Sequence, residues 1–175
     1  MYQISIYFNK IANSMITYYI NHVAVVSGNS FMIDNQVPPH ITLSSFNTKD
    51  EAAVISALEE ASKNWQQGKI KYVTTGTFFP FVLYIAPVLN EYLHGLSVDI
   101  YNALEPIEGI EIYKYYKPFQ WIPHTTIGKT LSQEEMQKAF RLMQTDFNVF
   151  DAKVVKIGLA KTNPYRDIWE YELNL

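Results

Sequence analysis

Two short segments of this sequence place a threonine two residues after a histidine, in the same order and the same setting. The first is Pro-His-Ile-Thr-Leu at residues 39–43, and the second is Pro-His-Thr-Thr-Ile at residues 123–127. Proline is tolerated at the first position of a strand, and the residues after it are apolar or β-branched. Since residues i and i+2 of a strand point to the same face, each segment should present an imidazole and a hydroxyl side by side.

These four side chains could perform acid–base chemistry on a phosphate group. Histidine titrates near neutral pH, so one of His40 and His124 could be a general base while the other is a general acid. Phosphoryl transfer needs an attacking and a leaving oxygen roughly in line on opposite sides of phosphorus, and two opposed histidines would serve those positions. Thr42 and Thr126 could donate hydrogen bonds to the non-bridging oxygens, where negative charge accumulates. Such a site would need no metal.

The sequence that follows each motif repeats as well. Thr48 with Glu51, and Ser132 with Glu135, have the spacing of a capping box, in which both side chains bind free N–H groups at a helix start. Each box begins eight residues after its histidine. We therefore predict an internal duplication of strand, short loop and capped helix, with the function located where the two copies face each other.

Periodicity of the apolar residues places the motifs in an α+β fold. The predicted strands, besides the two motifs, are 2–8, 69–78, 81–87, 149–161 and 167–174. The first should be half-buried, with Tyr2, Ile4, Ile6 and Phe8 on its core face and Gln3 and Ser5 on the other. The predicted helices are 10–26, Thr48 to before Gly68, one from about 89 and one from Ser132. A loop is predicted at 29–38, and residues 105–122 are the least regular part of the chain. Trp169, Tyr171, Leu173 and Leu175 should form the buried face of the last strand. No Gly-, Ser- or Pro-rich linker divides the chain, so residues 1–175 should form one domain with two similar lobes.

Composition excludes several classes of protein. The chain is 48% hydrophobic and 18% charged, which is typical of a globular protein. Its net charge is −3 and it has no Lys or Arg run, so we expect no grip on long nucleic acid and favour a small or short-ended substrate. The absence of cysteine excludes thiol nucleophiles, disulfides and Cys-ligated metals. We see no signal peptide and no apolar run that could span a bilayer, and take a cytoplasmic location as the default.

The paired motifs resemble those of the two-histidine (2H) phosphoesterase superfamily, which includes RNA 2′,3′-cyclic phosphodiesterases and the 2′-5′ RNA ligases. Residues 81–87, followed by Leu93 and His94, are similar to the strand and helix that precede the second motif in that family. The resemblance implies two pseudo-symmetric lobes with antiparallel sheets around a central cleft and helices on the outside. It also implies cleavage of 2′,3′-cyclic phosphates, or of 2′-5′ or 3′-5′ phosphodiesters, with no metal and no cofactor.

Carried over position by position, the resemblance makes His40 and His124 the acid–base pair, and Thr42 and Thr126 the phosphate ligands. Thr125 departs from the family pattern, because an apolar residue is more usual at that core-facing position. The resemblance leaves three functions open. They are hydrolysis of a cyclic or 2′-5′ nucleotide or RNA-end phosphate, binding of nucleotides or phosphometabolites without catalysis, and joining of RNA ends by the reverse reaction.

Further candidates lie close to the second motif. The aromatic segment that leads into it could stack on a nucleobase, or could be ordinary hydrophobic cover, and its lysines could pair with a phosphate or simply keep the surface soluble. The candidate substrate-binding residues are Tyr115, Tyr116, Lys117, Phe119, Trp121 and Lys129. His22 and His94 have no motif partner and are interpreted as structural. A zinc site is not predicted, because no third ligand has a suitable spacing from the motif histidines.

Overall fold

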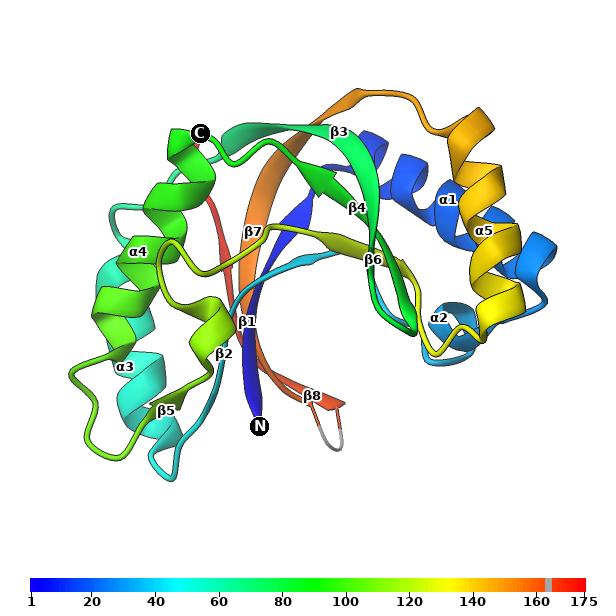
Figure 1. Ribbon diagram of the computed structural model, residues 1–175. Coiled ribbons are helices and arrows are strands. Elements are labelled where there is room, and N and C mark those ends of the chain that lie inside the picture. Colours follow the sequence, from blue (N-terminus) through cyan, green and yellow to red (C-terminus); the bar gives the residue numbers. More distant parts are fainter. Residues whose placement is uncertain (163–164) are drawn as a thin grey trace.

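The computed structural model describes residues 1–162 and 165–175, which form an α+β fold with helices on both flanks of an arched sheet (Figure 1). The strands are β1 (Tyr2–Phe8), β2 (Ile41–Asn47), β3 (Gly68–Phe78), β4 (Val82–Pro87), β5 (Glu111–Ile112), β6 (Thr125–Gly128), β7 (Phe150–Thr162) and β8 (Tyr165–Glu172). The helices are α1 (Lys10–Ser27), α2 (Phe31–Asp34), α3 (Glu51–Ser62), α4 (Glu91–Leu104) and α5 (Gln133–Asp146), with a 3-10 turn η1 at Lys114–Tyr116. Over the described ranges, every helix is too short or too polar to cross a bilayer.

One antiparallel sheet runs through both lobes. Its strand order is β5-β2-β1-β7-β3-β4-β6, with β8 paired to β7. Along one edge β7 pairs first with β3 and then with β8, while its other edge pairs with β1, so this long strand joins the two lobes. The strand β2 therefore lies beside β1 in one lobe, and β6 lies beside β4 in the other. The predicted two-lobed α+β fold is confirmed.

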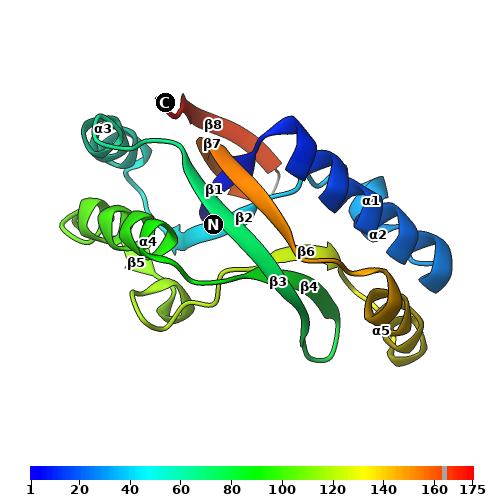
Figure 2. The same ribbon diagram turned by 90° about the horizontal axis from the view of Figure 1, so that it is seen from above.

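The two halves of the sequence exchange helices. α1 precedes β2 in the chain but packs against α5 and β6, whereas α4 precedes β6 but packs against α3 and β2. Figure 1 and Figure 2 both show α1, α2 and α5 on one flank and α3 and α4 on the other. Gly128 of β6 makes room for α1, since a Cβ atom there would lie 3.2 Å from Val23 Cγ1. Each motif strand is thus supported by a helix from the other half.

The first strand shows how the alternating pattern divides the sheet into a core face and a second face. Tyr2, Ile4, Ile6 and Phe8 are buried in the core, as predicted. The opposite face of β1 carries Gln3 and Tyr7, which are half-buried, and between them Ser5, which is only 3% exposed. A buried hydroxyl between two polar-tipped side chains indicates that this second face is not simply a solvated surface.

Of the two predicted capping boxes, one is confirmed and one is wrong. At the start of α5, Ser132 Oγ accepts from the Glu135 N–H at 3.3 Å, and Glu135 Oε2 accepts from the Ser132 N–H at 2.6 Å. The helix expected from Thr48 begins instead at Glu51, with Asp50 as its N-cap. Thr48 Oγ1 accepts from the Asp50 N–H at 3.0 Å, a local turn that competes with helix initiation.

Other boundaries also need correction. The loop predicted at 29–38 contains the short helix α2, and the helix expected from about 89 begins at Glu91 with Asn90 as its cap. The predicted end of the helix before Gly68 is confirmed, since α3 ends at Ser62. The strand β8 ends at Glu172, and beyond it Leu173 is buried whereas Leu175 is 95% exposed, so the buried face predicted for the last strand does not extend to Leu175.

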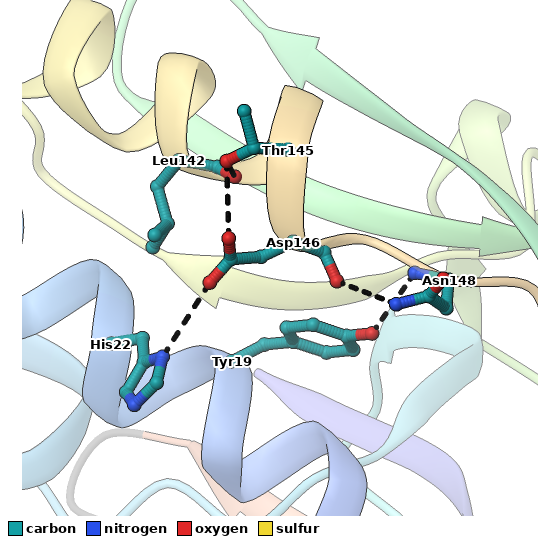
Figure 3. A network of polar contacts seen from close by, with 6 residues as sticks. All are labelled: Tyr19, His22, Leu142, Thr145, Asp146 and Asn148. Atoms are coloured by element: carbon teal, nitrogen blue, oxygen red, sulfur yellow. Dashed lines mark hydrogen bonds and ion pairs between the residues drawn. The ribbon is translucent and has the colours of Figure 1, made fainter.

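Polar contacts join α1 to α5 near their C-terminal ends (Figure 3). His22 Nδ1 lies 3.8 Å from Asp146 Oδ2, and the backbone N–H of Asn148 donates to the Tyr19 hydroxyl at 3.2 Å. Thr145 Oγ1 donates to the other carboxylate oxygen of Asp146 at 3.0 Å. His22 therefore contacts the C-terminal end of α5, a position that fits the structural role predicted for it.

Candidate active site

Both motifs enter the sheet in the same way. Pro39 and Pro123 are buried, and the histidine that follows each of them is half-buried. The strand itself begins one residue after the histidine, at Ile41 in β2 and at Thr125 in β6. Each histidine therefore immediately precedes its strand, and its backbone is not paired with a neighbouring strand.

The two histidines are fixed in the same tautomer. His40 Nδ1 lies 2.7 Å from the Pro38 carbonyl oxygen, and His124 Nδ1 lies 2.8 Å from the Ile122 carbonyl oxygen. A carbonyl oxygen can only accept, so Nδ1 carries the hydrogen in each neutral ring. Nε2 is consequently the nitrogen that can take up or release a proton, in both motifs.

The segment that leads into the second motif runs along the strand of the first. The Trp121 indole N–H donates to the Thr42 carbonyl oxygen at 2.9 Å, and the Tyr113 N–H donates to the Ser45 carbonyl oxygen at 3.0 Å. These bonds cross between residues far apart in sequence and tie the approach to His124 directly to β2. The structure thus brings the two motifs together.

Burial lowers the pKa of both histidines from the ordinary value of 6.5. For His40, desolvation is the largest cause, the bond to Pro38 opposes it, and the positive charges of His124 and Lys129 lower the pKa further. For His124, desolvation is again the largest cause and the bond to Ile122 opposes it. The repulsion between the rings means that they titrate as a pair, in which the first proton makes the second harder to bind.

Aromatic rings that the sequence analysis did not single out lie near both imidazoles. The Tyr7 ring centroid lies 6.4 Å from that of His40. Around His124, the Phe78 centroid lies at 4.8 Å in an edge-on arrangement and the Tyr84 centroid at 5.3 Å. The second histidine is therefore enclosed more closely by aromatic rings than the first.

Two glycines leave room for Tyr7 and Tyr84, the tyrosines beside the two histidines. A Cβ atom at Gly158 would lie 3.0 Å from the Tyr7 ring, and one at Gly76 would lie 2.5 Å from the Tyr84 hydroxyl. Ser5, two residues before Tyr7, pairs with Gly158 across β1 and β7, and Tyr84 pairs with Gly76 across β4 and β3. The same device, a tyrosine lying over a glycine of the next strand, thus occurs beside both histidines. Only the strand register reveals it.

The two motif threonines differ in their surroundings. Thr42 is 8% exposed, and it accepts a 2.6 Å hydrogen bond from the Gln3 side-chain amide, a residue that the sequence analysis did not single out. Burial raises the pKa of the Tyr116 phenol, and a hydrogen bond with Thr42 lowers it. Thr126 is half-buried opposite Tyr84 in the β4–β6 pair. The hydroxyl of the first motif is therefore held in place by neighbours from β1 and η1.

Thr125, the departure from the family pattern, points into the core as expected. Its hydroxyl lies 2.6 Å from that of Tyr72, and both residues are buried. Each hydroxyl satisfies the other, so a polar side chain at this core position carries no unpaired group. Its local packing is explained without any change to the motif.

The aromatic candidates before the second motif divide into exposed and buried residues. Tyr115 is 67% exposed and Phe119 is 86% exposed, with the Phe119 ring 4.5 Å from that of His94. Trp121 is only 7% exposed, and its bond to the Thr42 carbonyl makes it a support of β2 rather than an open platform. Tyr116 is half-buried beside Thr42. The segment is therefore partly cover and partly exposed surface.

Charged groups close to the histidines are few. Lys129 Nζ lies 5.6 Å from the Phe31 ring centroid, and its charge acts on His40. Lys117 is half-buried and follows η1, where its backbone N–H closes the turn. In the part of the chain that the structure describes, no group of three or more His, Cys, Asp or Glu side chains gathers as a metal site.

The lowered pKa values predict a pH dependence of stability. Between the folded-state values and 6.5 the unfolded chain binds more protons than the folded chain, so the free energy of unfolding rises with pH through this window. The contribution is complete above pH 6.5 and is lost as the pH falls through the folded-state pKa values. Urea midpoints should fall more steeply on acidification for the wild type than for the His40→Gln/His124→Gln double variant. Equal pH dependence of the two proteins would contradict this expectation.

Comparison with known proteins adds a family and a fold. The profile of the 2′-5′ RNA ligase superfamily matches residues 27–166. Comparison with the sequences of curated proteins gives no match. Among solved structures, E. coli LigT complexed with 3′-AMP is similar, with 13% identity, a TM-score of 0.60 and coverage of 99% of this chain and 98% of that chain.

Two further structures share the fold. TT0787 of Thermus thermophilus has 12% identity and a TM-score of 0.66, with coverage of 98% of this chain and 97% of that chain. The MHV ns2 PDE domain has 16% identity and a TM-score of 0.50, with coverage of 87% of this chain and 99% of that chain. At these identities the likeness establishes the two-lobed fold and leaves the substrate open.

Proposed function

The chain belongs to the 2′-5′ RNA ligase superfamily, and on that basis we propose that it is a metal-independent phosphodiesterase that hydrolyses a 2′,3′-cyclic or 2′-5′-linked nucleotide or RNA-end phosphate. The observation that carries the proposal is the matched pair of imidazoles. Both have Nδ1 bound to a backbone carbonyl two residues earlier, and both therefore present Nε2 as the reactive nitrogen. We further infer that residues 1–175 act as one domain, because a single sheet passes through both lobes.

The proposed reaction uses one histidine on each side of the phosphorus. A water molecule forms a new O–P bond while one imidazole takes its proton at Nε2. The bond from phosphorus to a ribose oxygen breaks, and that oxygen receives the proton carried by the other imidazole. The reaction requires a singly protonated pair, because one imidazole must be neutral to act as the base and the other charged to act as the acid. The charge of one ring opposes a second proton on the other.

Thr42 and Thr126 would bind the non-bridging phosphate oxygens, where charge develops in the transition state. Thr42 suits this role because its oxygen accepts from Gln3, so its own hydrogen, which can be donated to Tyr116 in the free protein, can be donated to a phosphate oxygen instead. A nucleotide ligand is further supported by the similar fold of E. coli LigT, whose solved complexes contain 3′-AMP, ATP and phosphate.

Hydrolysis of 2′,3′-cyclic AMP and of a 2′-5′-linked adenosine dinucleotide in excess EDTA tests the proposal. We expect turnover of at least one of them at a rate that the chelator does not change. Activity that EDTA abolishes and added divalent metal restores would contradict metal independence. Nucleotide binding by calorimetry without turnover would instead indicate a non-catalytic binder. Joining of 2′,3′-cyclic phosphate and 5′-hydroxyl RNA ends would indicate the reverse reaction.

A further inference from the structure

The two halves of the site differ at one side chain. Gln3 of β1 places its amide nitrogen 3.0 Å from His40 Nε2, 2.6 Å from Thr42 Oγ1 and 3.0 Å from Ser5 Oγ. Across the described residues, His124 Nε2 has no corresponding hydrogen bond from a side chain. The two histidines therefore share the backbone contact that fixes the tautomer at Nδ1, but they differ in the hydrogen bonding of Nε2.

The direction of the Gln3–His40 hydrogen bond follows from its surroundings. His40 Nδ1 carries the hydrogen, since it faces the Pro38 carbonyl, so Nε2 has only a lone pair to offer. Gln3 must then present its amino group, which donates. A donor at Nε2 stabilises the neutral imidazole and opposes its protonation, because imidazolium would place a second hydrogen against the first.

The described surroundings of His124 lack such a donor. Phe78 and Tyr84 hold their ring centroids 4.8 and 5.3 Å from that of His124. The Phe78 ring meets the imidazole at 83° and the Tyr84 ring at 58°, so both contacts are apolar, and neither ring offers a hydrogen to Nε2. Around His40 the corresponding ring, Tyr7, is 6.4 Å away. Of the two half-buried imidazoles, the second is therefore the one whose Nε2 has no side-chain donor against it among the described residues, so protonation meets less opposition there.

We propose that Gln3 is a positioning residue that keeps His40 neutral, so that His40 is the base and His124 carries the single proton of the pair as the acid. This inference rests on the proposed function for its catalytic meaning, but the proton distribution itself is a property of the free protein. It assigns roles that the duplicated motif alone leaves equivalent.

The assignment completes the proposed reaction. Water loses its proton to His40 Nε2 as its oxygen bonds to phosphorus, and the departing ribose oxygen takes the proton from His124 Nε2. The two hydrogens of the Gln3 amide face three acceptors, so the amide can release Nε2 for the water while it keeps its shorter bond to Thr42. Exchange with solvent then returns the proton from His40 to the pair's resting arrangement.

The other titratable groups near His40 also bear on its pKa. Lys129 and His124 both lower its pKa when they are charged. Tyr7 faces it from β1, and the Lys156 ammonium lies over the Tyr7 ring, 5.0 Å from its centroid. Tyr116 hydrogen-bonds with Thr42, which shares the Gln3 amide with His40. Among the described residues no carboxylate acts on His40, so none of these groups opposes the effect of Gln3.

Titration of the histidine Cε1–H resonances by NMR in the full chain tests the inference. We expect a lower pKa for His40 than for His124 in the wild type. Gln3→Leu removes the donor and should raise the pKa of His40, and Gln3→Glu should raise it further, by about one unit or more, because a carboxylate then faces Nε2. The pKa of His124 should change much less. Asn13→Asp, a charge-matched change at an exposed position of α1, is the control and should move neither value.

The test has two parts, which are the order of the His40 and His124 pKa values in the wild type and the selective change of the His40 pKa in the Gln3 variants. A His40 pKa at or above that of His124, or Gln3 variants that shift both histidines equally or neither, would overturn the inference. Where turnover is measurable, the acidic limb of the kcat/KM profile should move with the pKa of His40 in Gln3→Leu. The titration needs no substrate, so a protein that shows the expected order without hydrolysing any phosphodiester would refute the proposed function and leave the role of Gln3 standing.

Discussion

Replacement of either His40 or His124 by alanine is expected to reduce kcat/KM for the hydrolysed phosphodiester by about 10²–10⁴-fold, the usual contribution of a positioned acid or base. Both imidazoles are held in one tautomer by a backbone carbonyl, so no rearrangement of the ring is needed before proton transfer. The double variant should lose little more than either single variant, because an acid and a base that act in one step are not additive.

His22→Ala is the matched control for these variants. His22 contacts Asp146 between α1 and α5, and it takes no part in the candidate site. Its loss should leave kcat/KM within a few-fold of the wild type. Activity that survives both His40→Ala and His124→Ala, in proteins with wild-type circular dichroism, would refute two-histidine catalysis.

The second large effect is expected at the motif threonines. Thr42→Val and Thr126→Val keep the side-chain shape and remove one hydroxyl, and each should lower kcat by about 10²–10³-fold if that hydroxyl binds a phosphate oxygen in the transition state. Thr42→Val also leaves the Gln3 amide without its shortest acceptor. We therefore expect the Thr42 variant to shift the pH profile as well, whereas the Thr126 variant should lower the rate without such a shift.

Thr125→Val provides the control for these threonine variants. Thr125 is adjacent to Thr126 but faces the core, where its hydroxyl pairs with that of Tyr72. Its replacement should lower the free energy of unfolding by about 1–3 kcal/mol, because Tyr72 loses its partner, and should leave kcat nearly unchanged below the melting transition. Equal losses of kcat in Thr125→Val and Thr126→Val would show that the hydroxyls act through packing and not on phosphate.

Much of the fold could be predicted from local pattern. The alternation in β1 predicted its core face, and the Ser132 and Glu135 pair predicted the start of α5. The parallel prediction at Thr48 was wrong because Asp50, two residues later, is itself a strong cap and forms the helix start in its place. Spacing identifies a possible cap, but it does not decide between two neighbouring candidates.

The exchange of helices could not be predicted from the sequence. α1 and α4 have apolar faces of the expected period, and the pattern says only that each packs on a sheet. That α1 reaches β6 through Val23 and Gly128 depends on how the two copies of the repeat are arranged in space. Repetition predicted two lobes, whereas the intertwining of the halves is a property of tertiary packing.

The supporting residues of the site were missed for a related reason. Gln3 looked like the polar side of an alternating strand, and Tyr7 and Tyr84 looked like ordinary strand aromatics. Their places depend on the register that sets Ser5 opposite Thr42 and Tyr84 opposite Thr126. For Trp121 the sequence left open a stacking surface or hydrophobic cover, and the structure places it as cover, buried with its indole N–H on a backbone carbonyl of β2. The chemically distinctive His and Thr side chains were visible in sequence, and the residues that hold them were not.

A crystal structure of the protein with a nucleoside 2′- or 3′-monophosphate tests the central claim most directly. The account predicts that one phosphate lies between the two motifs, with His40 Nε2 and His124 Nε2 each within hydrogen-bonding distance of it and the Thr42 and Thr126 hydroxyls on its remaining oxygens. A phosphate bound elsewhere, or one that contacts a single histidine while the other remains out of reach, would contradict it.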